Sequence, residues 1–263
     1  MERIFDLMMC MGQSNMAGRG ITSERWPEPA AEPMPGIGYE YRAVSDPDHL
    51  HGIREPFGVD ENDPNGIYEP GKKTGSMVTA FANAYVPEAG APIIAVSASK
   101  GGSSITQWHG DEDDLLADAI RRCDRAQQYA AAHDIAFRHR YMLWCQGETD
   151  GDRGTSPDEY KRRFRHLFAL MQEHGIEACF LITIGEYNGP DERDYASIRQ
   201  AQLELADELP DVHLVCDELR TMRARGLMKD HYHYYQQAYN EVGTISGRVA
   251  GVVAGRNAAN ALG

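Results

Sequence analysis

The strongest constraint on the fold is a series of five short apolar runs that alternate with amphipathic stretches. The runs are bounded by turn residues and cover residues 4–11, 92–97, 141–145, 178–184 and 212–216. Continuous apolar runs of this length are typical of strands that are buried on both faces, as in a parallel sheet. The sequence therefore predicts a central, mainly parallel sheet of about five strands.

Four stretches between and after these runs have the spacing of helices. Apolar residues recur there at three- and four-residue steps, in residues 113–132, 157–174, 192–209 and 234–261. Alternating strands and helices predict an α/β fold, here a three-layer α/β/α sandwich. The absence of a linker or an internal repeat favours a single domain over residues 1–263.

Residues 19–75 interrupt this alternation. The segment holds eight of the thirteen prolines and many Gly, Asp and Glu residues, and it has no sustained period. An irregular stretch of this length inside a compact domain usually serves a function. We expect an ordered, irregular insertion that covers the carboxyl end of the first strand.

The composition excludes several classes of function. The formal charge is −14 and the pI is about 5.1, which argues against binding to nucleic acid or to an anionic membrane surface. No apolar run approaches the ~20 residues of a membrane span.

The first ten residues lack the basic region and cleavage site of a signal peptide. The five cysteines include no C-x-x-C pair, and four lie in the strand-like runs as expected for buried free thiols. These features favour a cytoplasmic location, with a secreted or periplasmic one as the alternative if a signal peptide has been removed, and nothing in the sequence indicates an oligomeric state.

Polar, glycine-rich turns follow three of the predicted strands. They begin at Gly12, Lys100 and Gln146, and an Asp230-x-x-His233 pair lies beyond the fifth strand. Ligands of open α/β sheets bind at the carboxyl ends of the strands. We therefore expect these four segments to meet at one edge of the sheet.

Three of these residues have the types needed for nucleophilic catalysis. Ser14, at a strand-to-helix turn, can act as a nucleophile if His233 takes its proton. Asp230 can accept from the other imidazole nitrogen and set the tautomer. Backbone N–H groups in glycine-rich turns can face a developing oxyanion. Taken singly, each feature is more often a helix cap, an ordinary loop or a surface histidine.

Five motifs occur in order from residue 4 to about residue 243. They are Gly12-Gln13-Ser14-Asn15-Met16, Gly101-Gly102-Ser103-Ser104-Ile105 with Trp108, Trp144-Cys145-Gln146-Gly147-Glu148-Thr149-Asp150, Ile198-Arg199-Gln200-Ala201-Gln202, and Asp230-x-x-His233. The set resembles the SGNH hydrolases, and within them the sialate O-acetylesterase and acetylxylan esterase branch. The resemblance implies a flavodoxin-like sandwich and a serine esterase that acts on acetylated carbohydrates without a cofactor or a metal.

The resemblance also implies roles for individual residues. Ser14 matches the nucleophile, Asp230 the acid and His233 the base. The oxyanion donors would be the N–H groups of Ser14 and Gly102 and the side-chain amide of Gln146, which replaces the asparagine of other SGNH enzymes.

Four further residues are candidates for substrate binding. They are Gln13, Asn15, Trp108 and Glu148. Trp108 is either a platform for a sugar ring or a core tryptophan, since buried tryptophans commonly serve packing. Glu148 is better suited to bracing its turn than to acid–base work, because acyl transfer needs no second carboxylate.

Two alternatives come from other classes of protein. His231 and His233 form an H-x-H pair that could bind a metal in a metal-dependent deacetylase, although no third ligand of clear spacing accompanies them. The chain could also be a non-catalytic carbohydrate-binding module, but the intact Ser, Asp and His set argues against it. The three-residue spacing from Asp230 selects His233 over His231 as the base.

Overall fold

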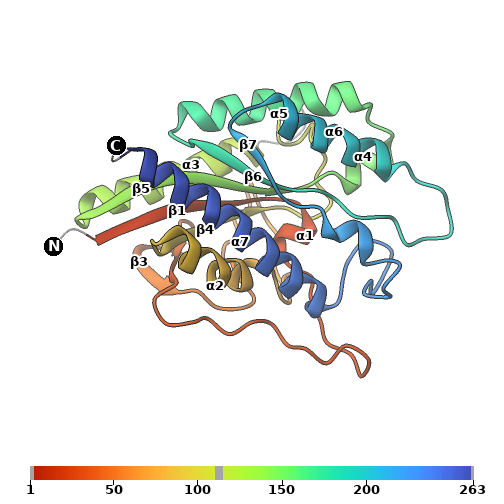
Figure 1. Ribbon diagram of the computed structural model, residues 1–263, viewed down its shortest axis with the longest axis horizontal. Coiled ribbons are helices and arrows are strands. Elements are labelled where there is room, and N and C mark those ends of the chain that lie inside the picture. The colour runs from red at the N-terminus through yellow and green to blue at the C-terminus, as the bar shows by residue number, and fades with distance from the viewer. Residues whose placement is uncertain (1–2, 110–114, 262–263) are drawn as a thin grey trace.

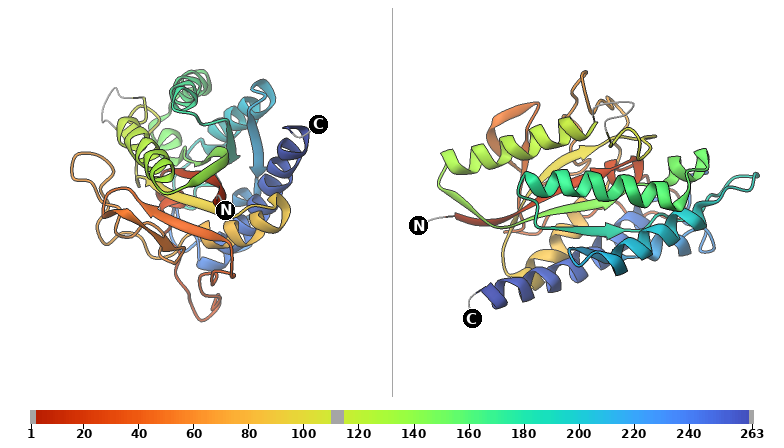
Figure 2. Two further views of the ribbon diagram at one scale, coloured as in Figure 1. Left: turned by 90° about the vertical axis from the view of Figure 1, so that its left-hand side faces the viewer. Right: turned by 90° about the horizontal axis from the view of Figure 1, so that it is seen from above.

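The computed structural model describes residues 3–109 and 115–261, which form a three-layer α/β/α sandwich (Figures 1 and 2). The seven-stranded sheet has the order β3-β2-β4-β1-β5-β6-β7. Neighbouring strands are parallel except β2 and β3, which pair antiparallel. The strands are β1 (Arg3–Gly12), β2 (Gly38–Arg42), β3 (Asp46–Gly52), β4 (Ile93–Ser99), β5 (Ile135–Cys145), β6 (Ala178–Ile182) and β7 (Val212–Cys216).

Helices cover both faces of the sheet, and this explains why the central strands are continuously apolar. On β1, Leu7 and Met9 face the core under one helical layer, and Met8 and Cys10 face the core under the other. The first layer contains α3 (Leu115–Ala132), α5 (Pro157–Glu173) and α6 (Tyr195–Glu208), and the second contains α2 (Val78–Ala89) and α7 (Gln236–Ala261). Three short helical segments complete the chain, namely α1 (Ser14–Ala17), α4 (Glu148–Arg153) and η1 (Glu218–Thr221).

The predicted sandwich with a mainly parallel sheet is confirmed, and the sheet has seven strands where about five were expected. The five apolar runs form β1, β4, β5, β6 and β7, and the four predicted helices are α3, α5, α6 and α7. The two additional strands, β2 and β3, come from the 19–75 segment, which is thus only partly irregular. Most of β3 is exposed at the edge of the sheet, so its sequence lacks the apolar pattern of a buried strand.

The remainder of the 19–75 segment is anchored by buried charges. Arg122 of α3 is buried, and its Nη1 donates to the carbonyl oxygen of Ser97, near the end of β4, at 2.8 Å. Its Nη2 pairs with Asp118 Oδ2 at 2.9 Å, and the same oxygen accepts from the backbone N–H of Ile67 at 2.9 Å. Lys73 Nζ donates to Ser97 Oγ at 2.8 Å. These bonds hold the second half of the segment against β4 and α3.

Three parallel strands end together at the centre of the sheet. The chain leaves β1 toward β2 and β4 on one side and later continues to β5, β6 and β7 on the other. In this register Gly12 lies opposite Ser99 of β4 and Cys145 of β5. Such a reversal of strand order opens a crevice outside the carboxyl ends of the strands. The three glycine-rich turns therefore meet there, as the sequence predicts.

Two further expectations concern cysteines and membrane spans. All five cysteines are free thiols buried in the protein, including the four in strand-like runs. Within residues 3–109 and 115–261, no helix has the length and apolar character needed to cross a bilayer.

The Arg122 anchor generates a stability prediction. Arg122→Met should lower the free energy of unfolding by about 3–5 kcal/mol, because it removes the buried cation that pairs with Asp118 and leaves that buried carboxylate only the longer ion pair to the half-exposed Arg121. The matched control is Arg121→Met, whose side chain is 46% exposed and whose ion pairs to Asp118 and Asp63 are 3.3 and 3.8 Å long. That variant should cost less than about 1 kcal/mol. Urea unfolding of both variants measures the difference, and equal losses would contradict the anchoring role.

Candidate active site

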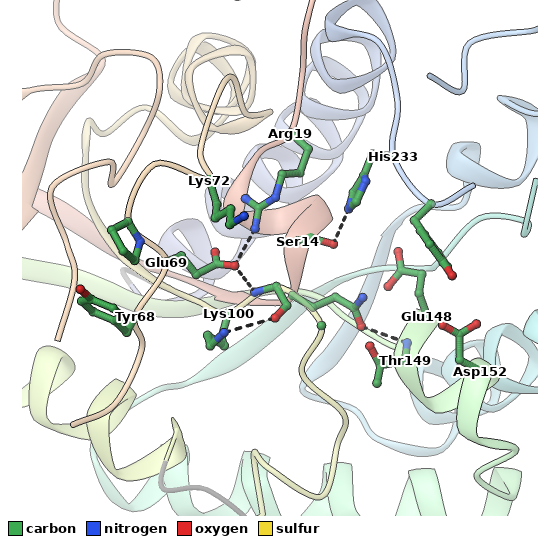
Figure 3. Close-up of a pocket in the computed structure, with 15 residues that line it drawn as sticks. Ser14, Arg19, Tyr68, Glu69, Lys72, Lys100, Glu148, Thr149, Asp152 and His233 are labelled. Atoms are coloured by element: carbon green, nitrogen blue, oxygen red, sulfur yellow. Dashed lines mark hydrogen bonds and ion pairs between the residues drawn. The ribbon is translucent and has the colours of Figure 1, made fainter. Parts of the chain in front are cut away.

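A pocket of about 440 Å³ lies at the carboxyl ends of the central strands (Figure 3). Its lining comes from five places in the sequence. They are the turn at residues 13–14 with Arg19, the segment 68–72, the turn 100–102, the start of α4 at 148–152, and residues 232–233. The pocket thus combines the turns after β1, β4 and β5 with the predicted Asp-x-x-His loop and part of the 19–75 segment.

The serine turn depends on a close approach between β1 and β5. Gly12, the last residue of β1, has φ +139°, and a Cβ there would lie 2.1 Å from the carbonyl oxygen of Cys145. Only glycine fits this position. The backbone N–H of Gln13 then donates to the same oxygen at 3.0 Å. Ser14 follows as the first residue of α1, with 6% of its surface exposed.

The structure places Ser14, His233 and Asp230 in one hydrogen-bonded chain. His233 Nε2 lies 2.9 Å from Ser14 Oγ (Figure 3). His233 Nδ1 lies 2.9 Å from Asp230 Oδ2. Because a carboxylate only accepts, Nδ1 carries the proton and Nε2 of the neutral ring accepts from the serine hydroxyl. Asp230 Oδ1 accepts from the backbone N–H groups of Tyr232 and His233, both at 2.8 Å. The loop thereby holds its own carboxylate in line with the imidazole.

The surroundings favour the protonation states that a base and its partner need. Burial lowers the pKa of His233, and the charges of Arg19 and Lys229 act in the same direction, so together they outweigh the Asp230 carboxylate, which raises it. Burial raises the pKa of Asp230, but the N–H groups of Tyr232 and His233 hold it below its usual range. At neutral pH the pair is a carboxylate beside a neutral imidazole.

Asn15 joins the serine turn to the histidine loop. Its Oδ1 accepts from the Tyr239 hydroxyl at 2.7 Å, and its Nδ2 donates to Glu148 Oε1 at 2.5 Å and to the carbonyl oxygen of Tyr232 at 3.2 Å. Asn15 was predicted to contact substrate, but it is fully buried and does not belong to the pocket lining. Glu148 does line the pocket, and burial raises its pKa to about 7 against the opposing hydrogen bond from Asn15.

Gln146, which the resemblance assigns as an oxyanion donor, is absent from the pocket lining. Its amide is buried outside the pocket lining, and its Nε2 donates to Ser103 O at 3.0 Å and to Asp150 Oδ2 at 2.6 Å. Both hydrogens are thus already used. Gln13 lines the pocket instead, and its Oε1 accepts from the backbone N–H of Gly147 at 3.1 Å. This bond holds the carbonyl end of the Gln13 amide on the turn after β5, and among the described residues no hydrogen bond from its Nε2 is found.

Trp108 belongs to the core and cannot form a platform for sugar. Its side chain is fully buried, its Nε1 donates to Ser103 Oγ at 2.8 Å, and its ring packs edge-to-face on Trp144 at 5.4 Å. The core interpretation is therefore correct. Two aromatic residues line the pocket instead, Tyr68 and Tyr232.

Several pocket residues escaped the sequence analysis because they lie in a segment without periodicity or in ordinary-looking positions. Arg19 and Glu69 form an ion pair of 2.5 Å beside Ser14, and Lys72 and Lys100 line the same side of the pocket. The sequence signal for these residues is the concentration of charges around residue 70, and such a concentration is equally typical of a solvated loop. Asp152, on the opposite wall, pairs with Arg193 outside the pocket lining at 2.6 Å.

The donor set for the metal-dependent alternative is not assembled in the part of the chain that the structure describes. No group of three or more His, Cys, Asp or Glu residues suited to a metal ion occurs there. His231 is exposed and points its ring toward Tyr187, with the ring centroids 5.7 Å apart, so it does not join His233 in the pocket.

The sequence and the fold both have known relatives. Residues 4–250 match the family described as carbohydrate esterase, sialic acid-specific acetylesterase. The fold is similar to that of an Arabidopsis thaliana protein, with 22% identity, TM-score 0.70 and coverage of 95% of this chain and 98% of the other. It is also similar to a carbohydrate acetylesterase from Xanthomonas citri, with 15% identity, TM-score 0.59 and coverage of 97% and 56%. No protein with a curated description matches the sequence. Because the family match spans nearly the whole chain, this protein belongs to the carbohydrate esterases of the sialic acid-specific acetylesterase family.

Proposed function

We propose that the protein is a serine esterase that removes O-acetyl groups from a carbohydrate through an acetyl-enzyme on Ser14. The observation that supports this most directly is the chain of two 2.9 Å hydrogen bonds from Ser14 through His233 to Asp230 at the wall of the pocket. A nucleophile, a base and a group that orients the base are the parts that acyl transfer requires. The family match supplies the acetylated carbohydrate as the class of substrate.

The first half of the reaction forms the acetyl-enzyme. Ser14 Oγ attacks the acetyl carbonyl carbon while His233 Nε2 takes the hydroxyl proton. Asp230 stabilises the imidazolium that results. When the tetrahedral intermediate collapses, the bond to the sugar oxygen breaks and His233 returns its proton to that oxygen. In the second half, water attacks the acetyl group, His233 again acts as the base, and acetate leaves Ser14.

The negative charge on the oxygen of the tetrahedral intermediate needs hydrogen-bond donors on the side of Ser14 that faces away from His233. We assign this role to the backbone N–H groups of Ser14 and Gly102 and to the Gln13 amide nitrogen, in place of Gln146. Gly102 lines the pocket with φ +70°, and Gln13 has its carbonyl end fixed on the turn after β5. Loss of one such donor typically lowers kcat by ~10²–10³-fold.

Alanine substitutions distinguish the serine mechanism from the metal-dependent alternative. Ser14→Ala and His233→Ala should each lower kcat for acetyl ester hydrolysis by about 10⁴-fold or more, because triad members act as a unit. The matched control His231→Ala should stay within about threefold of the wild type, because its ring lies outside the pocket. Acetate release is measured under identical conditions, with circular dichroism to check folding. An active His233→Ala variant, or activity that a chelator abolishes and zinc restores, would overturn the assignment.

The pH dependence follows from the pKa of the base. Below this pKa His233 is protonated and cannot accept the Ser14 proton, so kcat/KM should fall as the pH decreases. Because burial lowers the pKa of His233 below 6.5, the midpoint of the acidic limb should also lie below 6.5. A pH profile of kcat/KM measures this. A midpoint near 7 that disappears in Glu148→Gln would contradict the assignment and place the titration on Glu148.

The positive charge of one pocket wall favours acidic sugars over neutral sugars as substrates. Lys72 and Lys100 line this wall, and among the described residues neither has an ion-pair partner, whereas Arg19 is neutralised by Glu69. Two uncompensated ammonium groups in a chain of charge −14 favour a ligand with an anionic group. O-acetyl sialic acid carries a carboxylate and fits this wall better than neutral acetylated xylooligosaccharides.

Removal of both lysine charges tests this preference. Lys72→Met combined with Lys100→Met should raise KM for O-acetyl sialic acid by about tenfold, equivalent to ~1.4 kcal/mol of lost attraction. KM for acetylated xylobiose should not change. The matched control is Lys161→Met on α5, which removes one positive charge outside the pocket lining. Equal changes in KM for the acidic and the neutral substrate would contradict the preference.

A further inference from the structure

A buried glutamate from the 19–75 segment contacts the turn that follows β4. Glu69 Oε1 accepts from the backbone N–H of Gly101 at 2.7 Å and from Arg19 Nη2 at 2.5 Å. The Glu69 side chain is only 4% exposed, and its other oxygen, Oε2, is buried without a hydrogen-bond partner in the part of the chain that the structure describes. A buried carboxylate is costly to maintain, and a neutral acceptor would satisfy the Gly101 N–H at lower cost.

The contact occurs at the backbone beside the nucleophile. A Cβ on Gly101 would lie 2.4 Å from Glu69 Oε1, 2.5 Å from Arg19 Nη2 and 3.3 Å from Ser14 Cβ. Gly101 therefore packs closely against both the Glu69–Arg19 ion pair and the serine. Figure 3 shows Glu69 reaching Arg19 and this turn from the side of the pocket opposite Glu148.

The other hydrogen bonds of the turn fix its two ends. Lys100 N donates to Gly12 O at 2.9 Å, and the backbone N–H and Oγ of Ser103 both donate to Lys100 O, at 3.3 and 2.7 Å. Between them lie two glycines, the most flexible residues of the backbone. Gly102 has φ +70°, a Cβ there would meet no atom within 4 Å, and no hydrogen bond from its N–H is found among the described residues. The Lys100 ammonium contacts Gly101 O only at 3.5 Å.

We propose that Glu69 is a positioning residue for the oxyanion hole. By accepting from Gly101 N–H, its carboxylate fixes the peptide that precedes the Gly102 N–H, so that this donor is held ready beside Ser14. The proposal rests on the proposed function, since it assigns Gly102 as an oxyanion donor. It also gives the insertion a catalytic purpose, because the anchors at Arg122 and Lys73 hold the segment that presents Glu69.

The proposal predicts that removal of the Glu69 carboxylate weakens stabilisation of the transition state but not binding of the substrate. Glu69→Ala should lower kcat by about 10- to 100-fold, less than removal of a donor, with KM for an acetyl ester changed by less than about threefold. Affinity for a boronic acid that forms a tetrahedral adduct on Ser14 should fall by the same factor as kcat. Affinity for the deacetylated sugar should not change. Glu69→Gln retains a carbonyl oxygen for Gly101 and should restore kcat to within about fivefold of the wild type.

The matched control is Glu61, another buried glutamate of the same segment. Glu61 Oε1 and Oε2 accept from the backbone N–H groups of Ser45 and Val44, both at 3.0 Å, outside the pocket lining. Glu61→Ala should lower the unfolding midpoint and leave kcat unchanged. Where Glu69→Ala does not fold, Glu69→Asp serves instead, because its shorter side chain cannot reach Gly101 and Arg19 together and should lower kcat by about fivefold or more.

Three results would overturn the proposal. They are an unchanged kcat in folded Glu69→Ala or Glu69→Asp, a loss of boronic acid and sugar binding to the same extent, and a Glu69→Gln variant as impaired as Glu69→Ala. The last result would mean that kcat depends on neutralisation of the Arg19 charge by Glu69 and not on the hydrogen bond to Gly101. Absence of ester hydrolysis in the wild type would instead refute the proposed function, so the two failures are distinguishable.

Discussion

The close approach of β1 to β5 at Gly12 is the constraint on which the site depends. A side chain at this position would overlap the carbonyl oxygen of Cys145, so the turn to Ser14 is possible only with glycine there. The parallel registers then bring the ends of β4 and β5 alongside the serine turn. Each neighbouring turn can therefore supply backbone or side-chain groups to the same small volume, as expected where strand order reverses in an open sheet.

Within this volume, three carboxylates differ in their hydrogen bonds and ionisation because their surroundings differ. Asp230 accepts two backbone N–H groups and the imidazole, so it stays ionised and orients His233. Glu148 is buried with one oxygen bonded to the Asn15 amide, and burial raises its pKa to about 7. Glu69 shares one oxygen between a guanidinium and the N–H of Gly101. Residue type alone could not separate these roles, since the numbers and kinds of donors decide them.

The sequence predicts the fold and the triad better than the walls of the pocket. Buried strands carry a periodic apolar signal, and the spacing from Asp230 to His233 matches a tight turn, so both could be predicted. The exposed edge strand β3 has no such signal and was missed. The directions of the Gln146 and Trp108 side chains could not be predicted, because both residues belong to motifs that border the pocket, while their side chains are buried outside its lining. The direction of a side chain within a turn depends on long-range packing, which local spacing does not encode.

The site is organised by tethers from neighbouring loops to one rigid turn. Asn15, in the serine turn itself, donates to the Tyr232 carbonyl and so holds the histidine loop, and Glu148 holds the Asn15 amide in the required orientation. On the other side, Glu69 holds the glycine turn. The first tether is made by Asn15, the residue after Ser14, and the second ends at Gly101, where a Cβ would lie 3.3 Å from Ser14 Cβ. Preorganised dipoles need no rearrangement when charge develops in the transition state. Burying these carboxylates lowers the folding stability, and in return the activation barrier of each turnover is lower. Irregular segments without a core pattern can therefore contribute to catalysis when a single buried acceptor connects them to the sheet edge.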